Sequence, residues 1–130
     1  MTLVVDASAV AGWLLPDDTG PDLAELVVDH ADFTAPWLLW AELRNILIVT
    51  ERWGRLPPGL ADQLIEAVEG LGITLDTAPS NAGVLALARR HGLTVYDALY
   101  LDLALRSGAV LATLDDQLAH AARAEGVALA

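Results

Sequence analysis

The sequence predicts an α/β fold of three layers, in which helices cover both faces of a mainly parallel central sheet. Short apolar runs alternate along the chain with longer segments of helical periodicity. This alternation is typical of parallel sheets, because parallel strands need a crossover connection that is usually a helix. No internal repeat, low-complexity segment or linker interrupts it. At 130 residues, the chain is expected to form a single domain over residues 1–130.

The first half of the chain opens with a buried strand, since Thr2–Val5 is β-branched and aliphatic and ends at Asp6. Proline and glycine then mark the helix boundaries, because neither continues a helix well. Pro16 stops the first helix and Gly54 closes the third. After the first strand we expect helices at 7–15 and 22–29, a strand at 33–35, and helices at 37–52 and 57–70.

The second half of the chain carries clearer capping signals. Ser80 is a typical N-cap residue, and Gly92 and Gly108 stand where a helix would end in the left-handed conformation. An apolar run leads directly to Asp115. We expect a strand at 73–75, helices at 80–90 and 96–106, a strand at 109–114 and a last helix at 117–124.

The chain is strongly acidic, with 18 Asp and Glu against 7 basic residues, all of them arginine, and a net charge of −11. Such a chain repels nucleic acid at long range. Acidity favours binding of a cation, a basic partner, or both. Any attraction of RNA must therefore be local, and its expected sources are Arg44, Arg89, Arg90 and Arg106.

Cysteine is absent, which excludes disulfides and thiolate metal sites and permits a reducing compartment. The longest apolar stretch, 37–49, is too short and too charged to span a bilayer. Asp6 interrupts the first apolar run almost at once, so no signal-peptide pattern opens the chain. We expect a cytoplasmic protein with no membrane contact.

Two acids stand at the carboxyl ends of predicted strands, where open parallel sheets bind ligands: Asp6 and Asp115. Thr113 shares the side of Asp115 if the last strand extends that far, because residues two apart face the same way. Each acid alone is explained more simply as a helix N-cap. Both interpretations stay open at this stage.

Glu42 lies on an otherwise apolar helix, with Asn45 three residues later on the same face. This pair indicates either a polar pocket or a stripe that meets water. Asp97 begins another helix, where a first-turn acid is favoured by the helix dipole. Asp102 is turned away from Asp97 and is interpreted as a peripheral charge, and Asp116 as a first-turn acid.

Together the acids predict a metal site. Clustered carboxylates repel one another, and a divalent cation removes that repulsion. Oxygen ligands without cysteine suit Mg²⁺ or Mn²⁺, which can polarise a phosphoryl oxygen and activate water. Other chemistries lack their motifs, because Ser8 has no nucleophile-elbow glycines and no Walker loop or dinucleotide fingerprint is present.

Four segments of the sequence resemble PIN-domain ribonucleases, and more specifically the VapC-type toxins of bacterial toxin–antitoxin pairs. The match runs in order along essentially the whole chain. The segments are residues 4–8 (VVDAS), 42–45 (ELRN), 93–100 (LTVYDALY) and 111–115 (LATLD).

The resemblance implies a PIN-like fold in which Asp6, Glu42, Asp97 and Asp115 hold Mg²⁺ or Mn²⁺ and activate water to cleave single-stranded RNA. It further implies supporting roles for Ser8, Asn45 and Thr113. The implied partners are a cognate VapB-type antitoxin, an RNA substrate and a second copy in a homodimer, with DNA contacted only through the antitoxin.

Three other classes of protein could account for the acidic residues of an α/β chain. Receiver domains and haloacid-dehalogenase-like phosphatases share an acidic α/β pocket but rely on a lysine, which this chain lacks. The phosphatases also need an acid where Ser8 stands. The non-enzymatic alternative is an α/β interaction module whose acids are helix caps and surface charges.

Overall fold

The central sheet has four strands in the order β3-β2-β1-β4, and every neighbouring pair is parallel. The computed structural model describes residues 2–15, 23–29 and 32–130. Because all the pairs are parallel, the predicted parallel α/β fold is confirmed. The strands are β1 (Thr2–Val5), β2 (Asp32–Pro36), β3 (Thr74–Asp76) and β4 (Val110–Ala112).

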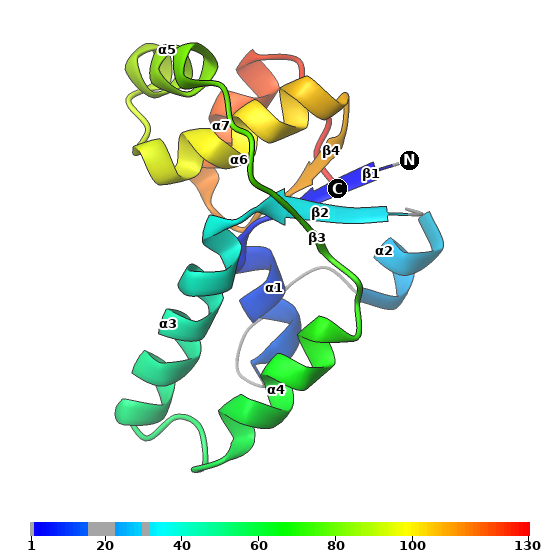
Figure 1. The fold of residues 1–130 in the computed structure, drawn as a ribbon, viewed down its shortest axis with the longest axis vertical. Helices are drawn as coiled ribbons and strands as arrows, with labels where there is room; N and C mark the ends of the chain where they lie inside the picture. The colour runs from blue at the N-terminus through cyan, green and yellow to red at the C-terminus, as the bar shows by residue number, and fades with distance from the viewer. Residues whose placement is uncertain (1, 16–22, 30–31) are drawn as a thin grey trace.

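Helices cover both faces of this sheet. In Figure 1, α5, α6 and α7 lie on one side of the strands, and α1, α3 and α4 lie on the other. Among the described residues, no helix is both long enough and apolar enough to cross a membrane. The helices are α1 (Ala7–Leu14), α2 (Leu23–Asp29), α3 (Leu38–Arg52), α4 (Leu60–Glu69), α5 (Asn81–His91), α6 (Val95–Ser107) and α7 (Asp116–Ala124).

Strand β1 and helix α6 form the centre of the core. Leu3, Val4 and Val5 are fully buried, which explains why β1 is a continuous apolar run: both of its faces are covered. Helix α6 contacts β1, β2 and β4, and every residue from Ala98 to Ala104 is buried. A helix enclosed on nearly all sides is apolar around most of its circumference.

Most elements match their predicted positions, and the differences have local causes. Helix α4 begins at Leu60 rather than at residue 57, because Gly59 before it has a left-handed φ of 88° that no helix continues. Strand β4 ends at Ala112, so Thr113 is not part of the strand. Residue 22, the predicted start of the second helix, lies outside the described residues, and α2 begins at Leu23.

Asp102 corrects one interpretation of the sequence. It is only 4% exposed, so it is not a peripheral charge. Arg106 Nε donates to Asp102 Oδ2 at 2.8 Å, and Arg106 Nη2 donates to Asp76 Oδ2 at 2.8 Å. As helical periodicity predicted, Asp102 points away from Asp97. Its side chain, however, faces α5 and not water. Asp102 and Arg106 therefore join α6 to the end of β3.

Gly83 on α5 packs directly against this ion pair, and we predict that Gly83→Ala destabilises the protein. A Cβ atom at Gly83 would collide with Asp102 Oδ1, and Arg106 holds that carboxylate in place. We expect the free energy of unfolding in urea to fall by about 1–3 kcal/mol, even though alanine is the better helix former by about 1 kcal/mol. Unchanged or increased stability would show that the Asp102 carboxylate moves aside without cost.

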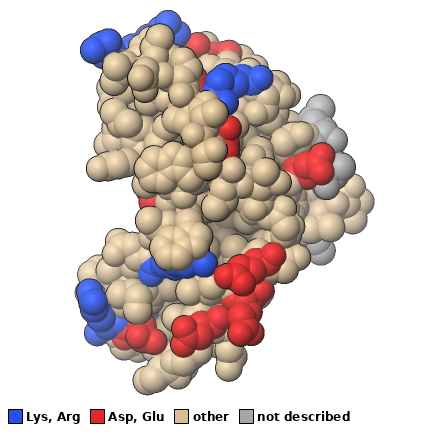
Figure 2. All heavy atoms as spheres, viewed as in Figure 1, with Lys and Arg blue, Asp and Glu red and all other residues tan. Residues whose placement is uncertain are grey.

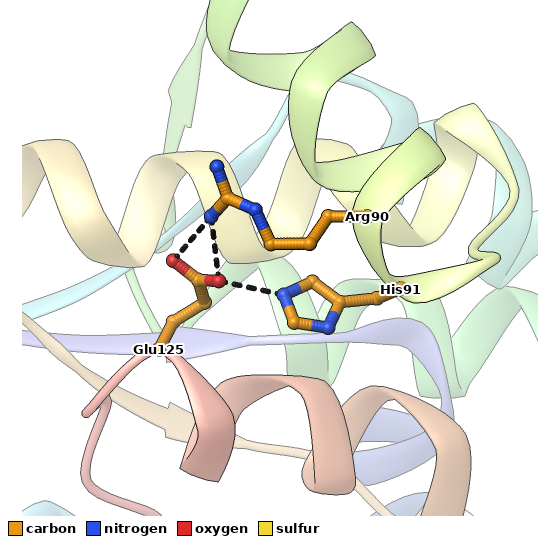
Figure 3. Close-up of polar contacts among 3 residues, drawn as sticks. All are labelled: Arg90, His91 and Glu125. Carbon is orange, nitrogen blue, oxygen red and sulfur yellow. Dashed lines mark hydrogen bonds and ion pairs between the residues drawn. The ribbon is translucent and has the colours of Figure 1, made fainter.

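A second polar cluster joins the ends of α5 and α7 (Figure 3). Arg90 Nη1 donates to both carboxylate oxygens of Glu125, at 3.0 and 2.8 Å, and His91 Nε2 lies 2.6 Å from Glu125 Oε2. The hydrogen bonds from Arg90, and then from His91, lower the pKa of Glu125. Gln117 Nε2 adds a hydrogen bond to the carbonyl of Gly92, 3.0 Å long. These contacts fix α7 against the turn that leads into α6.

Candidate active site

One cavity of about 200 Å³ brings together all four acids that the sequence singled out. It lies at the carboxyl ends of β1 and β4, which are neighbours in the sheet, as expected for a ligand site in a parallel α/β fold. The acids come from the β1–α1 junction, from α3, from the first turn of α6 and from the β4–α7 junction. The side chains lining it are those of Asp6, Ala7, Ser8, Glu42, Ile46, Asp97, Tyr100 and Asp115.

Asp6 is both a helix cap and a lining residue of the cavity. Its Oδ1 accepts hydrogen bonds from the backbone N–H of Ala9 at 2.8 Å and from Ser8 Oγ at 2.7 Å. Its Oδ2 accepts a hydrogen bond from Thr113 Oγ1. The side chain is buried, at 5% exposure. The two interpretations of Asp6 are thus compatible, since the capping bonds hold the carboxylate rigidly at the cavity wall.

Ser8 and Thr113 connect the two junctions that carry Asp6 and Asp115. Ser8 Oγ accepts a hydrogen bond from the backbone N–H of Leu114 at 2.9 Å. Thr113 Oγ1 accepts one from the backbone N–H of Asp115 at 3.0 Å. Thr113 reaches Asp6 from the loop after β4, and not from the strand as the sequence suggested. Both hydroxyls therefore lie where they support Asp6.

Asp97 and Asp115 lie at the N-terminal ends of α6 and α7. Asp115 Oδ1 caps α7 by accepting from the N–H of Leu118 at 2.9 Å. Asp97 lies in the first turn of α6, where its own N–H donates to Thr94 Oγ1 at 3.1 Å. Asp115 is thus a helix N-cap and Asp97 a first-turn acid, as the simpler interpretation of the sequence predicted, and the side chains of both also line the cavity.

Glu42 lies in the pocket rather than on an exposed stripe, because its half-buried side chain lines the cavity. Asn45 does not join it: its side chain is exposed and is not part of the lining. At about 100° per residue, Asn45 at i+3 is rotated about 60° to one side of Glu42, and the residue at i+4 is rotated about 40° to the other side. Ile46, at i+4, falls on the cavity side instead.

Tyr100 is a lining residue to which sequence reasoning gave no role. Its side chain is 1% exposed, and its hydroxyl donates a hydrogen bond to Glu42 Oε1 at 2.6 Å. Burial, and then the hydrogen bond to Glu42, raise the pKa of Tyr100 above its usual range, so the phenol keeps its proton. A signal was present in the sequence, since Tyr100 follows Asp97 by three residues and shares its helix face.

The acids in the cavity destabilise one another's charged forms. Burial, followed by the charges of Asp115, Glu42 and Asp6, raises the pKa of Asp97 to about 6. Burial is also the main reason why the pKa of Asp6 is raised, although hydrogen bonds from Thr113, Ala9 and Ser8 oppose it. A positive charge in the cavity would relieve both effects.

The donor set of the cavity fits a hard divalent cation. Four carboxylates supply oxygen ligands, the preferred ligands of Mg²⁺ and Mn²⁺, and no histidine or cysteine is among the lining residues. Within residues 2–15, 23–29 and 32–130, no three acidic or histidine side chains form a ready-made metal cluster. The carboxylates thus share one cavity without converging on one point.

Three of the four arginines considered for RNA contact are engaged within the protein. Arg44 stacks on Trp40, 3.9 Å from the ring centroid, and lies 3.5 Å from Glu69. Arg90 and Arg106 are held in the two clusters described above. Arg89 is exposed on α5. No arginine is among the described residues that line the cavity, whose lining is acidic.

Comparison with known proteins gives a consistent family. A family model for the PIN domain matches residues 3–124. The chain is 37% identical over 124 residues to "Ribonuclease VapC3" of Pyrobaculum aerophilum, covering 92% of this chain and 94% of that protein. It is 32% identical over 120 residues to "Ribonuclease VapC3" of Mycobacterium tuberculosis, covering 92% of this chain and 86% of that protein.

A solved structure shares the same architecture. The crystal structure of PAE2754 from Pyrobaculum aerophilum superposes with a TM-score of 0.76 at 26% sequence identity, covering 93% of this chain and 84% of that chain. The family match spans nearly the whole chain, and both sequence relatives exceed 30% identity. The chain therefore belongs to the PIN-domain family and is one of its VapC-type members.

Proposed function

We propose that this protein is a Mg²⁺- or Mn²⁺-dependent endoribonuclease toxin that cleaves single-stranded RNA and is neutralised by a cognate antitoxin. One observation carries the proposal. Asp6, Glu42, Asp97 and Asp115, which are far apart in the sequence, line one cavity at the carboxyl ends of β1 and β4. The names of the relatives, both "Ribonuclease VapC3", agree with it.

In this proposal the four carboxylates are the catalytic and metal-binding residues. A bound Mg²⁺ or Mn²⁺ supplies Lewis-acid polarisation of the scissile phosphate and activation of water. The capping bonds of Asp6 and Asp115 fix two of the acids before substrate arrives. Ser8 and Thr113 orient Asp6. Asn45 is exposed and is not part of the cavity lining, so this proposal assigns it no supporting role.

The surface charge supports a basic antitoxin of the VapB type as the partner. Figure 2 shows acidic side chains gathered along α4, where Asp62, Glu66 and Glu69 are exposed. A basic segment is attracted to such a surface, whereas RNA is repelled from it. RNA attraction then comes mainly from the cation in the cavity. DNA contact is proposed only through the antitoxin.

A homodimer is the further assembly we propose. Exposed apolar side chains cluster around a groove of about 260 Å³ between α5, the start of α6 and the start of α3. Clustered apolar exposure of this kind marks association surfaces. The groove contains Trp37, Leu85, Val95 and Tyr96, which are 48%, 42%, 47% and 59% exposed.

The proposed activity is tested with purified protein and an end-labelled single-stranded RNA. We expect internal cleavage with Mn²⁺ or Mg²⁺ and none with EDTA, because four unneutralised carboxylates repel phosphate. Asp6→Asn, purified identically, should not cleave. Asp116→Asn is the matched control, since this exposed neighbour of Asp115 is not part of the cavity lining. If the wild type cleaves no RNA under any of these conditions, the interaction-module alternative is favoured.

A further inference from the structure

Tyr100 is a buried polar side chain that lines the cavity and reaches one of its four acids. It extends from the middle of α6, where its ring is 1% exposed. Its hydroxyl ends 2.6 Å from Glu42 Oε1 on α3. The two residues are 58 positions apart in the sequence, and α6 and α3 lie on opposite faces of the sheet, so only the tertiary fold brings them together.

Glu42 depends on this contact for its orientation. Among the described residues, the Tyr100 hydroxyl is the only side chain hydrogen-bonded to Glu42. A glutamate side chain has three rotatable bonds and loses substantial entropy when it is ordered. The other ordered acids differ, because Asp6 and Asp115 are shorter and are held by backbone N–H groups. Without Tyr100, the Glu42 carboxylate would, like that of Asp97, have no hydrogen-bond partner among the described residues.

The bond also determines what Glu42 can offer to a ligand. A phenol has an ordinary pKa of about 10 and is a hydrogen-bond donor at neutral pH. By donating to Oε1, the hydroxyl of Tyr100 uses one of the lone-pair sites of the carboxylate and leaves the others for a ligand. Tyr100 also follows Asp97 by one helical turn, and both line the cavity. Glu42 is thereby tethered to the helix that carries Asp97.

We infer that Tyr100 is a positioning residue, which orients Glu42 relative to Asp97 so that both carboxylates can bind one divalent cation. This inference rests on the proposed metal-dependent function. Partners that orient metal ligands in this way are worth about 10–100-fold in metal affinity or activity. The competing explanation is that Tyr100 only fills the core.

Tyr100→Phe separates the two explanations, because it keeps the buried ring and removes only the hydroxyl. We expect the Kd for Mn²⁺, measured by electron paramagnetic resonance of free Mn²⁺, to rise about 10-fold. RNA cleavage should fall by a similar factor. Tyr96→Phe is the matched control: it removes the hydroxyl of the other tyrosine of the chain, which lies on the same helix and is 59% exposed outside the cavity, and it keeps the ring that lines the proposed dimer groove.

A double-mutant cycle tests whether Tyr100 acts through Glu42. If it does, Tyr100→Phe weakens Mn²⁺ binding in the wild-type background but adds little in the Glu42→Ala background. A residue that only fills the core would have the same effect in both backgrounds. Melting temperatures of all four metal-free proteins confirm that each is folded when its affinity is measured.

Failure of this inference is distinguishable from failure of the proposed function. If Asp97→Asn weakens Mn²⁺ binding while Tyr100→Phe and Tyr96→Phe have the same Kd for Mn²⁺, the positioning role is wrong and the metal-dependent function stands. If the wild type binds no Mn²⁺, or Asp97→Asn binds it equally well, both are wrong. Additive effects of Tyr100→Phe and Glu42→Ala would also overturn the inference.

Discussion

Replacing Asp97 with asparagine is expected to reduce metal-dependent RNA cleavage by at least about 100-fold, because even residues that merely support metal ligands contribute about 10–100-fold. Asp97 lines the cavity together with Asp115 and Glu42, and the charges of both act on it. Asparagine keeps the size and the helix position of the side chain but removes its charge. The measurement is the initial rate of cleavage of a single-stranded RNA at saturating Mn²⁺.

The control for this loss is again Asp116→Asn, which removes the same charge from an exposed site one residue beyond the cavity. It should cleave at nearly the wild-type rate. Equal losses in both variants would mean that overall charge, and not the carboxylate in the cavity, controls cleavage. A wild-type rate for Asp97→Asn would remove Asp97 from the set of metal ligands.

Asp97→Asn is also expected to stabilise the metal-free protein at pH 7.5. The pKa of Asp97 is raised from 3.8 to about 6 in the folded state, first by burial and then by the charges of Asp115, Glu42 and Asp6. The folded protein therefore holds this proton more tightly than the unfolded chain. Stability falls as the pH rises from about 4 to above 6, and asparagine, which does not ionise, avoids that loss.

The size of this stabilisation follows from the rise in the pKa of Asp97. A rise from 3.8 to about 6 corresponds to about 3 kcal/mol at about 1.36 kcal/mol per pKa unit. Because the side chain is partly exposed, water and salt screen the effect, and we expect about 1–2 kcal/mol. It should appear in urea unfolding with EDTA at pH 7.5 and vanish near pH 4.

Added Mn²⁺ provides the internal control for this prediction. A cation that binds only the folded state stabilises the wild type more than the variant. The difference in the free energy of unfolding between the two proteins should therefore shrink or change sign. Such opposition between stability and function is common at active sites. Lower stability of metal-free Asp97→Asn at both pH values would show that the Asp97 carboxylate stabilises the fold through contacts other than those described here.

The sequence predicted much of the site because strand ends are readable from local pattern. Asp6 and Asp115 each follow an apolar run, and the carboxyl ends of parallel strands meet at one edge of a sheet. That argument located two acids from hydrophobic periodicity alone. Glu42 and Asp97 needed the resemblance to PIN-domain toxins, since a carboxylate on a helix is equally well explained as a surface charge or a first-turn acid.

The tertiary structure decided the contacts between elements that are distant in sequence. Helical periodicity placed Asn45 beside Glu42, but the way α3 packs against the cavity puts Ile46 in the lining instead. Periodicity likewise turned Asp102 away from Asp97, and only the packing of α5 on α6 buried it. Local pattern gives the direction of a side chain relative to its own helix, not what lies in that direction.

The sequence by itself thus determined the parallel α/β architecture, because apolar periodicity and capping residues depend on near neighbours along the chain. Only the tertiary structure decided that Tyr100 reaches Glu42, that Thr113 reaches Asp6 from a loop, and that Arg106 reaches Asp76 at the end of β3. These contacts join residues on different elements. Their existence depends on how helices and strands cross, which is fixed by packing of the whole core.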